Sequence, residues 1–349
     1  MEVTEHQAEV KKCPNCKNRT VAPFPQDVLS PTYYGDNMKA YVAYLNTYHM
    51  LSYERICEYF ADMCNHPIGE GTIFNILNRY YEKLKTTEEK TKEVILASDV
   101  IHSDETGINV KGKLNWFHTA SCSVATYYLL HEKRGKEAMD EMDILPKYDG
   151  TVVHDHWSPY NKYENCTHAF CNAHHIRELT NAIETTDANW AKEMKRFLQI
   201  SHKIVKRAKK RGQIRLKEEQ IKKLELKYDN IIQSGHAFFP KIEKVPKKRG
   251  QTKKPKSQNL LLRLEKYKTE TLLFITDFQV PFDNNMAERD LRMIKVKQKI
   301  SGTFMSKTGG KIFARIKGYI STVKKNGRNV MKELKNVFIG EAFVPALVG

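Results

Sequence analysis

The stretch VIHSDETGINV at residues 100–110 decides the fold. Its β-branched residues predict a strand. Two further strand-like stretches follow at 113–122 and 125–133, then a helical stretch at 135–148 and the short apolar strand within GTVVHDHWSPY at 150–160. A short, fully apolar strand is typical of a buried parallel strand. The order of strand, strand, strand, helix and strand therefore predicts an α/β fold with a mixed sheet, in which the first and fourth strands can lie side by side.

Two aspartates lie on these neighbouring strands. Asp104 is on the first strand and Asp155 follows the fourth, so their carboxylates could converge. Two carboxylates held together are unfavourable unless a proton or a cation is shared between them. Magnesium prefers such oxygen ligands, and two ions about 4 Å apart can serve phosphodiester chemistry. Taken singly, each aspartate is better explained as a strand-end or turn acid, so the argument depends on the pair.

The composition indicates a polyanionic partner. The 349 residues carry a formal charge of +17 and a pI near 9.4, which favours nucleic-acid binding. No apolar run approaches the roughly 20 residues that cross a bilayer, and the polar start MEVTEHQAEV is unlike a signal peptide. We therefore expect a cytoplasmic protein with no membrane partner. Seven scattered cysteines favour reduced thiols over a disulfide framework.

The N-terminal region carries half of a metal site. Cys13 and Cys16 form the element CPNC, whose spacing lets two thiolates grip one zinc ion. His6 or a residue further upstream would have to complete the site, so a zinc ribbon and a non-binding remnant are equally open. The proline-rich stretch at 21–35 predicts an extended linker.

Residues 36–85 have a helical period, and Ser52 is a suitable N-cap for the second of three short helices. A glycine-containing turn before the third helix resembles a helix-turn-helix. In that case Thr72, Asn75 and Arg79 would lie on or near the side that faces the DNA groove. A small helical bundle with an aromatic core fits the same pattern.

Five blocks of the chain carry a family resemblance. They are SDETGINVKGKLNWFHTA, GTVVHDHWSPYNKY, THAFCNAHHIREL, PFDNNMAERDLRMIKVKQKISGTF and FARIKGYISTVKKNGRNVMKEL. Together, in collinear order over nearly the whole chain, they resemble the transposases of the insertion sequence 66 family. The long stretches DNNMAERDLR and CNAHHIREL are far more specific than any isolated acid.

The resemblance implies a ribonuclease-H-like core with a catalytic triad at Asp104, Asp155 and Glu288, which would hold two Mg²⁺ or Mn²⁺ ions. It implies a DNA transposase that cuts double-stranded DNA at transposon ends and transfers the 3′ hydroxyl to target DNA. We expect a homodimer or a higher assembly on DNA, in a bacterial cytoplasm and associated with the nucleoid. A ribonuclease-H-like nuclease without strand transfer and a catalytically idle DNA-binding derivative are the alternatives.

The third acid lies in a predicted helix within 281–302, which Asp283 or Asn284 would cap. Its mainly apolar stripe consists of Ala287, Leu291, Ile294 and Gln298. Judged by spacing alone, Glu288 and Arg292 would be an ordinary helix pair worth about 0.2 to 0.5 kcal/mol. As a metal ligand, Glu288 would instead lie among cations that follow the DNA phosphates. These predicted DNA-binding residues are Arg289, Arg292, Lys295, Lys297 and Lys299.

More chain separates Asp155 from Glu288 than a minimal core needs, which predicts a basic helical insertion. Its loop residues Lys247, Lys248 and Arg249 are further candidates for DNA contacts, although a solvated charged face is the default explanation for any single lysine. At the boundary between the core and the insertion, Cys171 and His174 form a C-x2-H element like that found after the second Asp in several transposase families. We interpret it as structural or substrate-positioning, with a zinc site as the lesser alternative.

These observations divide the chain into six predicted regions. They are a partial zinc ribbon and linker at 1–30, a helix-turn-helix-like region at 31–90, the first part of the core at 91–172, the helical insertion at 173–275, completion of the core with the Glu288 helix at 276–325, and a tail at 326–349.

Overall fold

The computed structural model describes residues 4–25, 33–239 and 254–347. A five-stranded sheet with the order β5-β4-β3-β6-β7 forms its centre. The strands are β3 (Val100–Val110), β4 (Lys113–Ser121), β5 (Thr126–His131), β6 (Thr151–His154) and β7 (Thr167–Phe170). The β4 strand is antiparallel to both β3 and β5, whereas β6 runs parallel to both β3 and β7. The predicted mixed sheet and the pairing of its first and fourth strands are confirmed, and the topology is consistent with a ribonuclease-H-like core.

Helices cover both faces of the sheet because side chains alternate along β3. Ile101 points to one face, where α4 (Lys85–Leu96) and α5 (Lys136–Met142) supply apolar partners. Ile108, an odd number of residues further on, points to the other face and packs with α11 (Asn285–Ser301). The next helix, α12 (Lys307–Lys325), lies along β5. The acids of β3 are therefore divided between two different environments.

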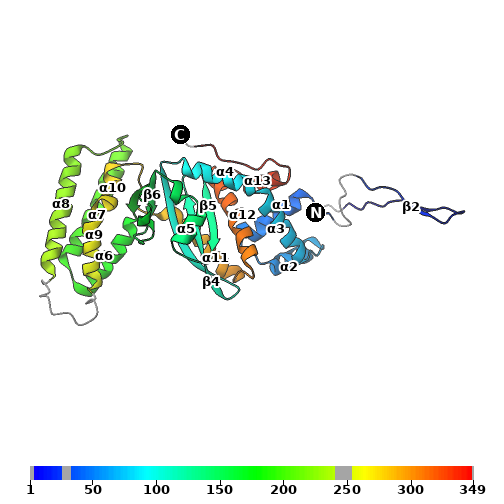
Figure 1. Cartoon of the computed structure of the whole chain (residues 1–349), viewed down its shortest axis with the longest axis horizontal. Helices are drawn as coiled ribbons and strands as arrows, with labels where there is room; N and C mark the ends of the chain where they lie inside the picture. The colour runs from blue at the N-terminus through cyan, green and yellow to red at the C-terminus, as the bar shows by residue number, and fades with distance from the viewer. Residues whose placement is uncertain (1–3, 26–32, 240–253, 348–349) are drawn as a thin grey trace.

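The chain between β7 and α11 forms a helical unit with its own core. Its helices are α6 (Asn172–Thr186), α7 (Asn189–Lys210), α8 (Glu218–Phe238), α9 (Lys256–Lys266) and α10 (Lys268–Thr276). Trp190, Tyr228 and Leu261 are buried among these helices. Figure 1 shows them gathered at one end of the molecule, on the β6 side of the sheet. The predicted contacts Lys247, Lys248 and Arg249 lie outside the described residues.

A second helical unit lies at the opposite end of the molecule in Figure 1. It is built from helices near the N-terminus together with one helix near the C-terminus. It contains α1 (Asp36–Ala43), the π-helical turn Tyr44–Tyr48, α2 (Tyr53–Cys64), α3 (Glu70–Lys83) and α13 (Val330–Phe338). Ser52 caps α2 as predicted, because its hydroxyl accepts the Arg55 amide. The Tyr80 hydroxyl donates to the Leu334 carbonyl at 2.9 Å, so α13, in the predicted tail, completes this N-terminal core. The helix-turn-helix interpretation stays a prediction.

The Cys13–Cys16 element forms the turn of a small hairpin that lies apart from the helices in Figure 1. Its strands are β1 (Val10–Lys12) and β2 (Arg19–Val21). The backbone amides of Cys16 and Asn15 lower the pKa of the half-buried Cys13 thiol, as suits a metal ligand. Within the described residues, however, no third ligand joins the pair. Zinc binding here stays a prediction, and part of the predicted linker, 26–32, lies outside the described residues.

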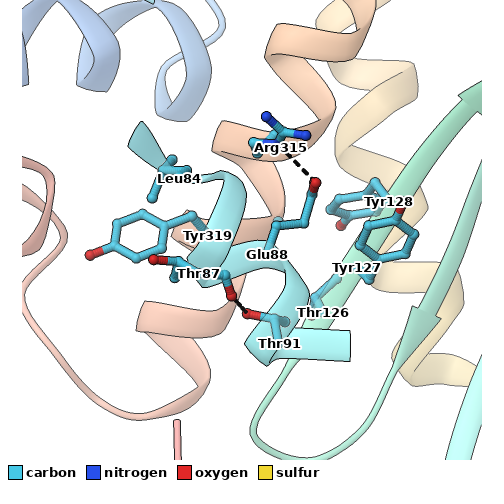
Figure 2. Close-up of a pocket in the computed structure, with 10 residues that line it drawn as sticks. Leu84, Thr87, Glu88, Thr91, Thr126, Tyr127, Tyr128, Arg315 and Tyr319 are labelled. Atoms are coloured by element: carbon cyan, nitrogen blue, oxygen red, sulfur yellow. Dashed lines mark hydrogen bonds and ion pairs between the residues drawn. The ribbon is translucent and has the colours of Figure 1, made fainter. Parts of the chain in front are cut away.

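An ion pair fastens the N-terminal helices to the core. Figure 2 shows Glu88 of α4 facing Arg315 of α12 beside Tyr127 and Tyr128 of β5. The Arg315 guanidinium lies 2.8 Å from the Glu88 carboxylate and also donates to the Tyr81 carbonyl at 2.6 Å. Burial raises the pKa of Glu88, and Arg315 offsets part of that effect. Throughout the described ranges, every helix is too short or too polar to span a membrane.

Candidate active site

The strand register brings Asp104 and Asp155 to equivalent positions on neighbouring strands. His102 of β3 is paired with Val153 of β6, and each aspartate lies two residues beyond its member of that pair. Adjacent strands are about 4.8 Å apart, and residues two apart point to the same face. This register puts both aspartates at the end of the β3–β6 ladder, and the charge of Asp155 influences the pKa of Asp104.

The electrostatics of Asp104 reflect this crowding. Burial raises the pKa of Asp104 to about 7, and the neighbouring charges of Glu105, Asp155 and Glu288 add to the increase. The Glu105 amide donates to the Asp104 carboxylate at 2.8 Å and offsets part of it. Because an uncompensated acid cluster disfavours ionisation, a bound cation would favour the ionised form of Asp104.

Asp155 is held in position by its own turn. Its carboxylate accepts the Trp157 amide at 2.9 Å, and its carbonyl oxygen accepts a hydrogen bond from the buried His154 ring. The polypeptide thus turns sharply where β6 ends, and the side chain is restrained beside β3. This arrangement follows from the sequence DHW directly after an apolar strand.

Asn284 places Glu288 on the same side of the sheet. The Asn284 amide group donates to the Ser103 carbonyl at 2.9 Å, and its oxygen lies 2.8 Å from His102 Nδ1. These contacts fix the first turn of α11 against β3, one residue before Asp104. Neither predicted residue forms a standard N-cap. Asn284 occupies the N-cap position, but its side chain makes no capping hydrogen bond. The Asp283 carboxylate, one residue earlier, accepts the Asn285 amide at 3.1 Å. Glu288 then follows one turn into the helix.

Three side chains of α6 and its N-cap surround Glu288. Cys171 Sγ lies 4.0 Å, His174 Nδ1 3.8 Å and Arg177 Nη2 3.3 Å from Glu288 Oε1. Arg177 is thus the cation beside Glu288, where spacing alone suggested Arg292. The C-x2-H element therefore contacts the third predicted acid directly. His175, by contrast, is fully buried behind it.

The acids fit a hard divalent cation. Within the described part of the chain, neither Asp104 nor Asp155 forms an ion pair with a side chain. Carboxylate oxygens are the ligands that magnesium and manganese prefer. Asp104 and Asp155 are therefore residues that could hold such an ion, and Glu288, whose charge also raises the pKa of Asp104, is the third candidate ligand.

The cations of α11 divide into exposed and buried groups. Arg289, Arg292 and Lys299 are exposed. Lys295 is also exposed, and its ammonium donates to the Gly107 carbonyl. Lys297 differs from the prediction, because its stem is buried and its ammonium lies 5.5 Å from the Phe304 ring centre. Burial also lowers the pKa of Lys297 to about 8, and with its side chain covered Lys297 is a weaker candidate for a DNA contact than the exposed cations of α11.

The structure also places Arg79, a predicted DNA contact, and Asp290, an acid of the α11 segment. Arg79 lies on the exposed side of α3, where a DNA contact is sterically open. Asp290 is paired with Lys325 at 3.2 Å and has no place in the acid cluster. The contributions of Asn284 and Arg177 were missed. Only one signal pointed to Arg177: Cys171, His174 and Arg177 recur at intervals of three, which puts them on one helix face.

The structure is an α/β protein with a five-stranded mixed sheet, consistent with a ribonuclease-H-like core, and it carries Asp104 and Asp155 on or directly after two neighbouring strands. Residues 31–312 match the family model described as Transposase IS66 family, and the chain belongs to this family. Membership supports a transposase role and implies that the protein acts on DNA. No curated protein matches the chain.

Proposed function

We propose that the protein is a DDE-type transposase that cuts DNA at the ends of its insertion sequence and transfers the 3′ hydroxyl to target DNA. Asp104, Asp155 and Glu288 are the proposed metal ligands. The observation that carries the proposal is the position of Asp104 and Asp155, equivalent on adjacent parallel strands and free of ion pairs among the described residues.

Each residue of the proposed site would have a separate role. Asp104 gives up its proton when a divalent cation is present, and the Asp155 turn keeps the second carboxylate beside it. Asn284 holds Glu288 at the same strand ends. Magnesium or manganese, when bound, supplies activation of water and stabilisation of charge on the leaving oxygen. The exposed Arg289 and Arg292 would bind the phosphates that flank the scissile bond.

Replacement of Glu288 by Gln tests the proposed triad. Glutamine keeps the shape of the side chain and loses the charge, so DNA binding should persist while magnesium-dependent cleavage falls by at least about 100-fold. The matched control is Glu184→Gln, which changes an exposed acid on α6. Full strand transfer by Glu288→Gln protein on end-sequence DNA would contradict the assignment.

A ribonuclease-H-like nuclease would use the same carboxylates, so product analysis has to separate the two functions. Purified protein is incubated with labelled end-sequence DNA, supercoiled target and magnesium. We expect labelled ends joined covalently to the target. Cleaved ends without joined product would favour the nuclease, and metal-independent binding alone would favour an idle DNA-binding derivative.

A further inference from the structure

The three donor atoms around Glu288 differ in kind from the aspartates of β3. The sulfur of Cys171, Nδ1 of His174 and a Glu288 carboxylate oxygen all lie within 4.8 Å of one another. Thiolate, imidazole and carboxylate are the ligands that zinc accepts, whereas magnesium avoids sulfur. This cluster thus offers a second type of metal chemistry at the edge of the proposed active site.

The spacing is close to that of a coordinated ion. Bonds of about 2.0 to 2.3 Å in tetrahedral geometry put ligand atoms about 3.4 to 3.6 Å apart. Glu288 Oε1 lies 3.8 Å from His174 Nδ1 and 4.0 Å from Cys171 Sγ. Small side-chain rotations would close these gaps, because all three residues lie at the starts of two helices fixed to the sheet.

Two observations indicate that the donors are oriented for a ligand. His174 Nδ1 is buried and has no hydrogen-bond partner, which is costly for a polar atom unless a ligand uses it. The Cys171 sulfur accepts the backbone amide of Asn284 at 3.2 Å. Such an outer-shell hydrogen bond stabilises a thiolate and orients it toward a metal.

The geometry points to a zinc-type cation site formed by Cys171 Sγ, His174 Nδ1 and Glu288 Oε1, with a fourth position open to solvent. On binding, the Cys171 thiol releases its proton to the buffer and the sulfur lone pair forms the metal bond. Arg177 Nη2 lies 3.3 Å from Glu288 Oε1 and competes with an ion for this oxygen, and because its side chain is 61% exposed it can move away. The consequence for catalysis rests on the proposed function: an ion here takes an oxygen of the third triad acid, so zinc should lower magnesium-dependent cleavage.

Cobalt(II) serves as the probe because a thiolate–cobalt bond gives a charge-transfer band in the near ultraviolet. The protein is the full chain with Cys13→Ser and Cys16→Ser, which removes the N-terminal pair as a competing site. We expect one equivalent of cobalt to give the band, one equivalent of zinc to remove it, and about one proton to be released for each ion.

Further substitutions in this background identify the ligands. Cys171→Ser should abolish the band, His174→Ala should weaken cobalt binding at least tenfold, and Arg177→Ala should tighten it. Cys166→Ser is the matched control, because Cys166 is another buried free thiol outside the cluster. The inference is overturned if the folded protein gives no cobalt band or if the band survives Cys171→Ser. It is also overturned if Arg177→Ala leaves the affinity for cobalt unchanged. Arg177 is exposed, so this last substitution does not disturb the core.

The two proposals fail separately. Absence of the cobalt band with intact magnesium-dependent cleavage would remove only the zinc-type site. A cobalt band lost in Cys171→Ser, together with full cleavage by Glu288→Gln protein, would remove only the triad assignment.

Discussion

Asp104 and Glu105 are consecutive acids on β3, yet the two faces of the sheet treat them in opposite ways. Glu105 points to the α5 side, where the Arg134 guanidinium lies 2.7 Å away and the Tyr160 hydroxyl donates at 2.6 Å. Asp104 points to the α11 side, where its charged neighbours are other acids. The protein thus completes the Glu105 site with its own cation, Arg134, and this contrast supports the proposal that an external cation completes the Asp104 site.

The largest expected effect is on catalysis. Asp155→Asn should reduce magnesium-dependent DNA cleavage by at least about 1,000-fold, or about 4 kcal/mol, because a proposed metal ligand is lost. Glu105→Gln should keep cleavage within tenfold, since glutamine still accepts from Tyr160. Initial rates on end-sequence DNA measure both. Equal losses in the two variants would erase the distinction between the faces.

The second effect is on stability. Arg134→Met leaves Glu105 buried without its cation and should lower the free energy of unfolding by about 2 to 3 kcal/mol. The matched control is Arg177→Ala, which removes the exposed partner of Glu288 and should change stability by less than about 0.5 kcal/mol. Urea unfolding monitored by circular dichroism compares them. If both variants are equally stable, the Glu105 pair is not structural.

The third effect concerns pH. The pKa of folded Asp104 is raised to about 7, so the folded state binds more protons than the unfolded state between about pH 4 and pH 7. Its contribution to stability is therefore lost as pH rises through that window. In the presence of a chelator, Asp104→Asn should match the wild type at pH 4 and be more stable at pH 8 by roughly 1 to 2 kcal/mol.

The control for this comparison is a divalent cation. Magnesium should stabilise the wild type at pH 8 and have a smaller effect on Asp104→Asn protein. Thermal unfolding at the two pH values, with and without magnesium, measures the difference. A wild type whose stability does not fall between pH 4 and pH 8 relative to Asp104→Asn would show that the acids are not crowded.

The smallest effect distinguishes the cations of α11. Arg292→Ala should reduce the slope of log affinity for DNA against log salt concentration by about 1, because one phosphate contact is lost. Lys297→Met is the matched control and should leave the slope unchanged, since Lys297 is buried against aromatic rings. Fluorescence anisotropy across a salt series measures both slopes. A reduced slope in Lys297→Met alone would reverse the two assignments.

Local patterns were sufficient to predict β3, β4, β5 and β6 and the pairing of β3 with β6, whereas β7 was not predicted. The alternation of β3, the apolar β6 and the Ser52 cap are encoded within a few residues. Contacts between distant segments could not be predicted in this way. Cys171 and Glu288 are 117 residues apart, and α13 packs against α3 across most of the chain.

The phase of helix α11 explains why Lys297, which the sequence placed among the exposed cations, is buried. The predicted apolar stripe continued from Ile294 to Gln298, whereas the structure turns Lys297 inward and leaves Gln298 half-buried. Positions three and four residues after Ile294 both lie near the buried side of a helix, so spacing alone does not choose between them. The rings of Phe304 and Phe313 explain why Lys297 rather than Gln298 is the buried residue. The apolar stem of Lys297 can cover these rings while its ammonium reaches Ser301.

The most direct test of the central claim is anomalous diffraction from crystals of the protein grown with manganese. Asp104 and Asp155 should hold a manganese ion between them, with Glu288 within reach of the same centre, and Asp104→Asn crystals should lose the peak. Manganese bound elsewhere in the chain, with no anomalous peak beside Asp104 and Asp155, would contradict the claim that these two acids, at the end of the β3–β6 ladder, share a catalytic cation.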